Sequence, residues 1–137
     1  TRHTRTETDI KELFPIDDIV FEVDNKSLTN RPDLWGHYGI AREFAALTGR
    51  ELKPLDLAGI DSDSENVVPV TIGDTEHVFR VYSCLRMANI TKHVSPMEIR
   101  IRLFHCGMRP INLLAGLTNY IMLEIGQPTH AFDATKN

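Results

Sequence analysis

Hydrophobic and polar residues alternate near the start of the chain, in the stretch DDIVFEVDN at residues 17–25. Ile19 and Phe21 fall on the same face of this alternation, which has the two-residue period of a half-buried β-strand. Two further runs, VVPVTI at 67–72 and HVFRVYSCLRMANI at 77–90, are also interpreted as strands. The pattern therefore predicts β-structure in both halves of the chain.

The first predicted strand leads into a helix through a polar turn. The turn is KSLTNRPD at residues 26–33, rich in capping and turn-forming residues, and we call it the elbow. In LWGHYGIAREFAAL at 34–47, apolar residues recur at helical spacing, and Gly49 stands where a helix commonly ends. This part of the chain is therefore predicted to be a strand–elbow–helix unit.

Two further helices are predicted in the second half. In SPMEIRIRLFHCG at 95–107, Ser95 can cap the first turn, Pro fits the first helical position and Gly107 ends the helix. In RPINLLAGLTNYIMLEIG at 109–126, apolar residues recur on one side, which predicts a mostly buried helix that stops at Gly126.

A linker separates the two halves. The run KPLDLAGIDSDSEN at 53–66 contains proline, glycine and an acidic, serine-containing stretch, which places a domain boundary near residue 60. We therefore predict an α+β fold with two parts. Residues 1–60 form the strand–elbow–helix unit and the linker, and residues 61–137 form part of a mixed α/β domain.

Composition narrows the class of protein. The chain has 137 residues, 42% of them hydrophobic and 25% charged, as expected of a globular cytoplasmic protein. No run approaches the roughly 18 apolar residues of a membrane span, so no membrane partner is expected. The net charge of −4 argues against a surface that binds nucleic acid everywhere. Because the chain starts without Met or a signal peptide, we expect it to be a piece of a longer protein.

The cysteine and histidine residues are not spaced as the ligands of a metal site. Cys84 and Cys106 are far apart, and both are predicted to be buried small hydrophobes. His105 beside Cys106 has no third ligand at metal spacing. His37, within the first predicted helix, is interpreted as a satisfied packing histidine. No metal site is predicted.

One polar cluster could carry chemistry. Thr118 and Asn119 lie inside an apolar helix, and His130 follows that helix in the stretch GQPTHAFD at 126–133. A tight Gly-Gln-Pro reversal can bring His130 back beside the helix end, where an imidazole is suited to assist hydrolysis. Spacing alone leaves the alternative open that His130 is structural and that Thr118 and Asn119 only form helix-to-helix or cap hydrogen bonds.

Two stretches together resemble the β subunit of bacterial phenylalanine–tRNA ligase. VDNKSLTNRPDLWGHYGIAREFAALTG at 23–49 is similar to the strand, Asn-Arg-Pro-Asp elbow and helix that close the family's N-terminal domain. SPMEIRIRLFHCGMRPINLLAGLTNYIMLEIGQPTHAFD at 95–133 resembles the first half of its editing domain. The resemblance covers roughly residues 17–133, and both signatures stand in the family's order.

The resemblance implies an enzyme that attaches phenylalanine to its tRNA with ATP and magnesium, built from two α and two β subunits. Synthesis takes place on the α subunit, and the β editing domain hydrolyses tyrosine wrongly attached to phenylalanine tRNA. Editing is needed because an apolar pocket rejects a similar ring with one added hydroxyl only weakly. By motif, His130 is the catalytic editing histidine, and Thr118, Asn119 and Pro128 line the pocket.

The same resemblance implies that this chain holds only part of the machinery. The rest of the editing pocket lies further along the family's chain, so we expect the isolated piece to be inactive and to bind neither ATP nor magnesium. Gly116 replaces an acid, Thr129 replaces a larger apolar residue, and Arg80 is displaced by one position. The departures at Gly116 and Thr129 keep open a non-catalytic RNA- or protein-binding module with a decayed pocket. A stand-alone deacylase is a weaker alternative.

Overall fold

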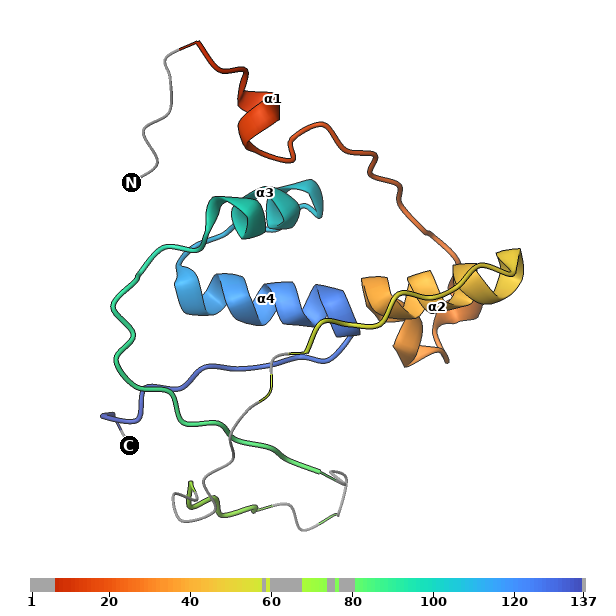
Figure 1. The fold of residues 1–137 in the computed structure, drawn as a ribbon. Helices are drawn as coiled ribbons and strands as arrows, with labels where there is room; N and C mark the ends of the chain where they lie inside the picture. Colours follow the sequence, from red (N-terminus) through yellow and green to blue (C-terminus); the bar gives the residue numbers. More distant parts are fainter. Residues whose placement is uncertain (1–6, 58, 60–67, 74–75, 77–80, 137) are drawn as a thin grey trace. The chain divides into compact units, whose positions relative to one another are not determined.

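The computed structural model describes residues 7–57, 59, 68–73, 76 and 81–136 (Figure 1). Within them the elements are α1 (Ile10–Leu13), η1 (Lys26–Leu28), η2 (Pro32–Trp35), α2 (His37–Thr48), α3 (Met97–His105) and α4 (Leu113–Ile125), where η marks a 3-10 helix. The chain divides into two units, one made of Thr1–Leu52 and Lys92–Asn137, the other of Lys53–Thr91. All these helices belong to the first unit. The division at residue 60 into two functional domains stays a prediction.

The elbow and the helix after it follow the local sequence signals. The Asn25 side chain accepts a hydrogen bond from Ser27 N at 2.9 Å and so starts η1. Pro32 starts η2, where its fixed φ suits the first turn. Helix α2 ends at Gly49, whose φ of 66° is left-handed and whose N–H donates to Ala45 O. The predicted end of this helix is confirmed.

Helices α3 and α4 pack against each other (Figure 1). Leu103 of α3 is fully buried. The Asn112 side chain starts α4 by accepting from Ala115 N at 2.8 Å. Gly107, with φ of 73°, and Gly126, with φ of 76°, follow the ends of the two helices. Both predicted helix ends are therefore confirmed.

The prediction of a mostly buried α4 is wrong for the residues that the structure describes. Gly116 is the buried residue of this helix, while Ile121 and Ile125 are 37% and 39% exposed. Among the described elements, α3 covers one side of α4, and α2 and η2 contact it. These neighbours leave part of the apolar stripe open.

The predicted cap of α3 is also wrong. Ser95 does not cap the helix; its hydroxyl donates to Asn112 O at 3.1 Å and is buried. A side chain on Gly116 would collide with the Ser95 hydroxyl and lie 3.2 Å from Ser95 Cβ. Tertiary packing between the start of α3 and α4 therefore overrides the local capping pattern, and it explains why glycine is tolerated inside α4.

The main correction to the predicted α+β fold concerns its β-strands. The described parts of 17–25, 67–72 and 77–90 form no strand; residues 67 and 77–80 lie outside them. A strand is held by hydrogen bonds to a neighbouring strand, and no partner is present among the described residues. The predicted buried face is exposed instead, with Ile19 at 87% and Phe21 at 72%. Only the helical part of the α+β prediction is confirmed.

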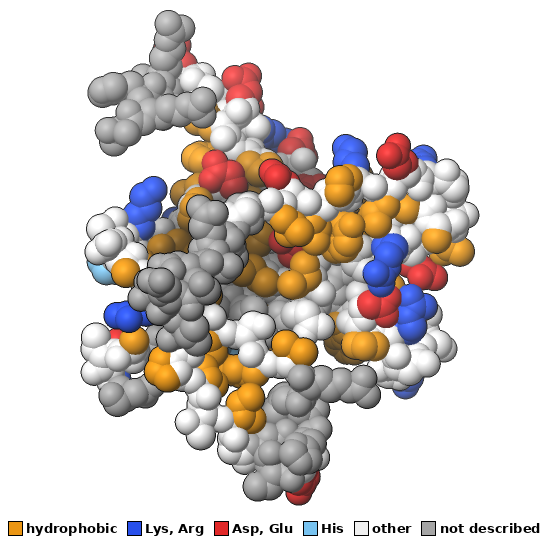
Figure 2. Space-filling model, turned by 60° about the horizontal axis from the view of Figure 1, so that its bottom comes forward, with side chains coloured by type: hydrophobic (Ala, Val, Ile, Leu, Met, Phe, Trp, Pro, Cys, Tyr) orange, Lys and Arg blue, Asp and Glu red, His pale blue; other side chains and the backbone are white. Residues whose placement is uncertain are grey.

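Apolar side chains remain on the surface in quantity. Figure 2 shows hydrophobic groups spread over the visible face. Cys84 and Cys106 are exposed as well, so the prediction that both are buried is wrong. Cys84 lies in a segment that pairs with no strand among the residues that the structure describes, and Cys106 follows the last residue of α3. In the part of the chain described, no helix has the length and apolar character needed to cross a membrane.

Candidate functional site

The four predicted site residues lie on α4 and on residues 126–133, which we call the histidine segment. Thr118 and Asn119 are half-buried on α4, whereas Pro128 and His130 are exposed on the histidine segment. The structure thus places them on two consecutive elements. Among the described residues, no hydrogen bond joins His130 to any of the other three. Their roles in a site therefore stay predictions.

The histidine segment turns back along α4 after the helix ends. The Thr129 hydroxyl donates to Thr118 O at 3.3 Å, across 11 positions of sequence. Thr118 uses its own hydroxyl to donate to Ala115 O at 3.1 Å, within the same helix. The His130 ring lies next to Phe132, with 6.3 Å between the ring centroids. The reversal therefore brings the residue before His130 into contact with α4, a role for Thr129 that sequence reasoning missed.

A second histidine ties the start of α2 to the end of α4 (Figure 1). His37 Nδ1 lies 2.8 Å from Leu123 O, and because a carbonyl only accepts, Nδ1–H is the donor. The other ring nitrogen, Nε2, lies 3.8 Å from Cys106 Sγ at the end of α3. The predicted satisfied packing histidine does find partners, but its side chain is exposed rather than buried.

Two glycines bring the same two helices into backbone contact. An ideal Cβ on Gly36 would lie 2.6 Å from Ile125 C and 3.0 Å from Gly126 Cα. One placed on Gly126 would lie 3.2 Å from Pro32 O in the elbow. Glycine is therefore required at position 36 because the end of α4 occupies the space of a side chain.

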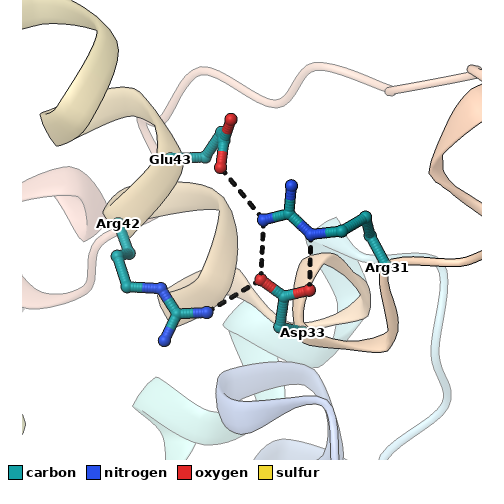
Figure 3. A network of polar contacts seen from close by, with 4 residues as sticks. All are labelled: Arg31, Asp33, Arg42 and Glu43. Atoms are coloured by element: carbon teal, nitrogen blue, oxygen red, sulfur yellow. Dashed lines mark hydrogen bonds and ion pairs between the residues drawn. The ribbon is translucent and has the colours of Figure 1, made fainter.

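An arginine–carboxylate cluster holds the elbow against α2 (Figure 3). Arg31 donates two hydrogen bonds to Asp33, from Nε to Oδ1 and from Nη2 to Oδ2, both at 2.9 Å. The same Nη2 lies 3.1 Å from Glu43, and Arg42 Nη2 lies 2.8 Å from Asp33 Oδ2. The paired donors of Arg31 suit the two oxygens of Asp33, which fixes the geometry of the elbow.

These contacts change the ionisation of both partners. The hydrogen bonds from Arg31 hold the pKa of the Asp33 carboxyl well below its usual range; partial desolvation opposes this and Arg42 adds to it. The hydrogen bonds to Asp33, then to Glu43, raise the pKa of Arg31. The four side chains are between 31% and 55% exposed, so solvent screens the cluster and its contribution to stability is modest.

Acid should weaken the fold through Asp33. A carboxyl with a lowered folded-state pKa stabilises the fold above its unfolded pKa of about 3.9. It loses that contribution as the pH falls through the lower folded value. We expect Asp33→Asn to reduce stability at neutral pH and to flatten the loss of stability below about pH 4. Urea midpoints from pH 7 to pH 2 measure this. Asp56→Asn, at an exposed position outside the cluster, is the control, and identical acid slopes for Asp33→Asn and wild type would contradict the assignment.

Metal-binding groups are not gathered in the described ranges. No three His, Cys, Asp or Glu side chains there lie in an arrangement that could hold a metal ion. The acidic groups of the arginine–carboxylate cluster are already engaged by Arg31 and Arg42. These paired carboxylates do not fit a magnesium site.

Known proteins of one kind resemble this chain over most of its length. Residues 78–137 match the B3/4 domain family. The phenylalanine–tRNA ligase beta subunit of Solibacter usitatus is 46% identical over 119 residues, which are 85% of this chain and 15% of that protein. The beta subunits of Leptospira biflexa and Latilactobacillus sakei are 38% identical over 128 residues and 36% identical over 129 residues, each covering 93% of this chain. The chain spans about 15% of the length of the curated relatives that it matches.

Proposed function

Because the chain is homologous to the β subunit of phenylalanine–tRNA ligase in its B3/4 region, we propose that it contributes the histidine side of a site that hydrolyses mischarged tRNA. The observation that carries this proposal is the B3/4 match over 78–137, which contains α4 and the whole histidine segment. The substrate would be phenylalanine tRNA that carries tyrosine, and the products would be tyrosine and the tRNA with its hydroxyl restored.

The chemistry required is the hydrolysis of an ester. A water oxygen bonds to the carbonyl carbon, the bond from that carbon to the ribose oxygen breaks, and the water proton ends on the ribose oxygen. His130 is exposed on the histidine segment, so substrate and water can reach its imidazole. We assign to it the orientation of the attacking water or of the ester. Thr118, Asn119 and Pro128 would line the pocket around it.

The whole enzyme would bring the other components. Charging of tRNA with phenylalanine would use ATP and magnesium on the α subunit, in an assembly of two α and two β subunits in the cytoplasm. No described residue of this chain is assigned to ATP or magnesium, and the half of the pocket that senses the tyrosine hydroxyl is expected elsewhere in the subunit. The piece alone is therefore expected to be inactive.

The alternative of a decayed binding module rested on Gly116 and Thr129. Gly116 is packed against Ser95 with no room for a side chain. The residues around position 116 therefore suit a glycine and would not accommodate an acidic side chain. Thr129 makes a hydrogen bond that returns the histidine segment to α4. Neither residue therefore favours a decayed pocket over a functional editing site.

The proposed function is tested by the release of labelled tyrosine from mischarged phenylalanine tRNA. The assay uses the parent β subunit assembled with its α partner, and correctly charged tRNA is the matched substrate. We expect tyrosine to be released at least about tenfold faster than phenylalanine, a difference of ~1.4 kcal/mol in the barrier. Release of tyrosine no faster than in buffer would contradict the proposal and favour the binding module.

A further inference from the structure

His37 closes the C-terminal end of the helix that precedes the histidine segment. The last four carbonyls of a helix have no partner within it, and Leu123 O belongs to that group because α4 ends at Ile125. His37 Nδ1–H supplies the missing donor at 2.8 Å from a residue 86 positions away. The bond therefore fixes the last turn of α4 from outside the helix.

The histidine ring is itself held in one orientation. Leu123 O can only accept, so Nδ1 carries the proton in the bond. In the neutral ring Nε2 is then an acceptor, and the Cys106 thiol, 3.8 Å away, can donate to it. The ring is thus anchored on both sides, between the end of α3 and the end of α4.

The residue next to His37 touches the point where the histidine segment begins. Gly36 lies so close to Ile125 and Gly126 that no side chain fits between them. Gly126, with φ of 76°, starts the reversal, and Thr129 completes it by its bond to Thr118 O. The position of the histidine segment is therefore set at two points, the end of α4 and the Thr129 contact.

We propose that His37 is a positioning residue for the editing reaction: its bond to Leu123 O sets the end of α4 and, through Gly126, the place of His130. This inference rests on the proposed function. Small displacements matter for such a group, since a shift of about 1 Å can cost up to ~100-fold in rate. In this view the elbow and the start of α2 are part of the support of the editing site.

Two substitutions of similar size separate this role from general stability. In His37→Asn the side-chain N–H lies where Nδ1 was, whereas in His37→Gln it lies where Nε2 was. In the α–β assembly we expect His37→Gln to lower kcat for tyrosine release about tenfold, with KM for the mischarged tRNA within about twofold. His37→Asn should keep kcat near the wild-type value. Charging with phenylalanine should be unchanged in both variants, which shows that they assemble.

Hydrogen exchange gives a readout independent of activity. The backbone amides of residues 123–127, 129 and 130 should exchange faster in His37→Gln than in wild type, and His37→Asn should restore their protection. Equal kcat values for the two variants, or slower editing in His37→Gln without faster exchange, would overturn the inference.

His130→Ala is measured alongside to separate the two proposals. If it slows tyrosine release while His37→Gln does not, the positioning role is overturned and the proposed function stands. If His130→Ala is as fast as wild type, or if wild type does not release tyrosine, the proposed function fails, and the positioning role fails with it.

Discussion

Replacing Gly39 by alanine is expected to lower the free energy of unfolding by about 1–3 kcal/mol. In an unobstructed helix the same change would stabilise by about 1 kcal/mol, because alanine is the better helix former. Gly39 is buried in the first turn of α2, and a Cβ there would overlap Asp33 O and lie 2.6 Å from Asp33 C. The obstacle is backbone, held in place by the arginine–carboxylate cluster, so it cannot move aside cheaply.

The sign of the change in unfolding free energy tests whether the elbow packs against α2. Gly59→Ala and Gly73→Ala are the controls, since among the described residues no atom beyond the chain neighbours lies within 4 Å of the added Cβ at either position. We expect both variants to stay within about 0.5 kcal/mol of wild type. Urea unfolding of the four proteins measures the differences. A Gly39→Ala variant that is more stable than wild type would show that the elbow does not pack against α2 as described.

Local signals in the sequence located the ends of α2, α3 and α4, whereas α1 was not predicted. A helix commonly ends at a residue with left-handed backbone, and glycine adopts that conformation most readily. The ends of α2, α3 and α4 are followed by such glycines, Gly49, Gly107 and Gly126. The reversal of the chain after Gly126 could likewise be predicted from the Gly-Gln-Pro sequence.

Non-local interactions account for what the sequence did not reveal. The alternation around Ile19 and Phe21 predicts a strand, but a strand needs a partner that the described residues do not contain. Ser95 has the local pattern of a cap, yet its hydroxyl bonds to Asn112 O instead. His37 finds Leu123 across 86 positions, and no spacing rule signals such a contact. Polar residues inside an apolar helix and the Gly-Gln-Pro turn marked Thr118, Asn119 and His130 as a cluster, and the family resemblance supplied its expected function.

The second large effect is expected on the rate of editing, from substitution of His130. We expect His130→Ala to slow the release of tyrosine by at least about tenfold, or ~1.4 kcal/mol in the barrier, because the variant loses the imidazole that orients water or ester. His93→Ala is the matched control: this histidine is also exposed, and its contact with Leu113 N runs through its backbone carbonyl. That variant should release tyrosine at the wild-type rate.

The role of His130 is tested most directly by single-turnover hydrolysis of tyrosine from mischarged phenylalanine tRNA by the α–β assembly, with His130 intact and with His130→Ala. Single-turnover conditions isolate the hydrolytic step from product release. We expect rapid clearance by the intact enzyme and at least about tenfold slower clearance by the variant, with equal rates of phenylalanine charging in the two proteins. Equal clearance by the two proteins would contradict this role and leave His130 a structural residue.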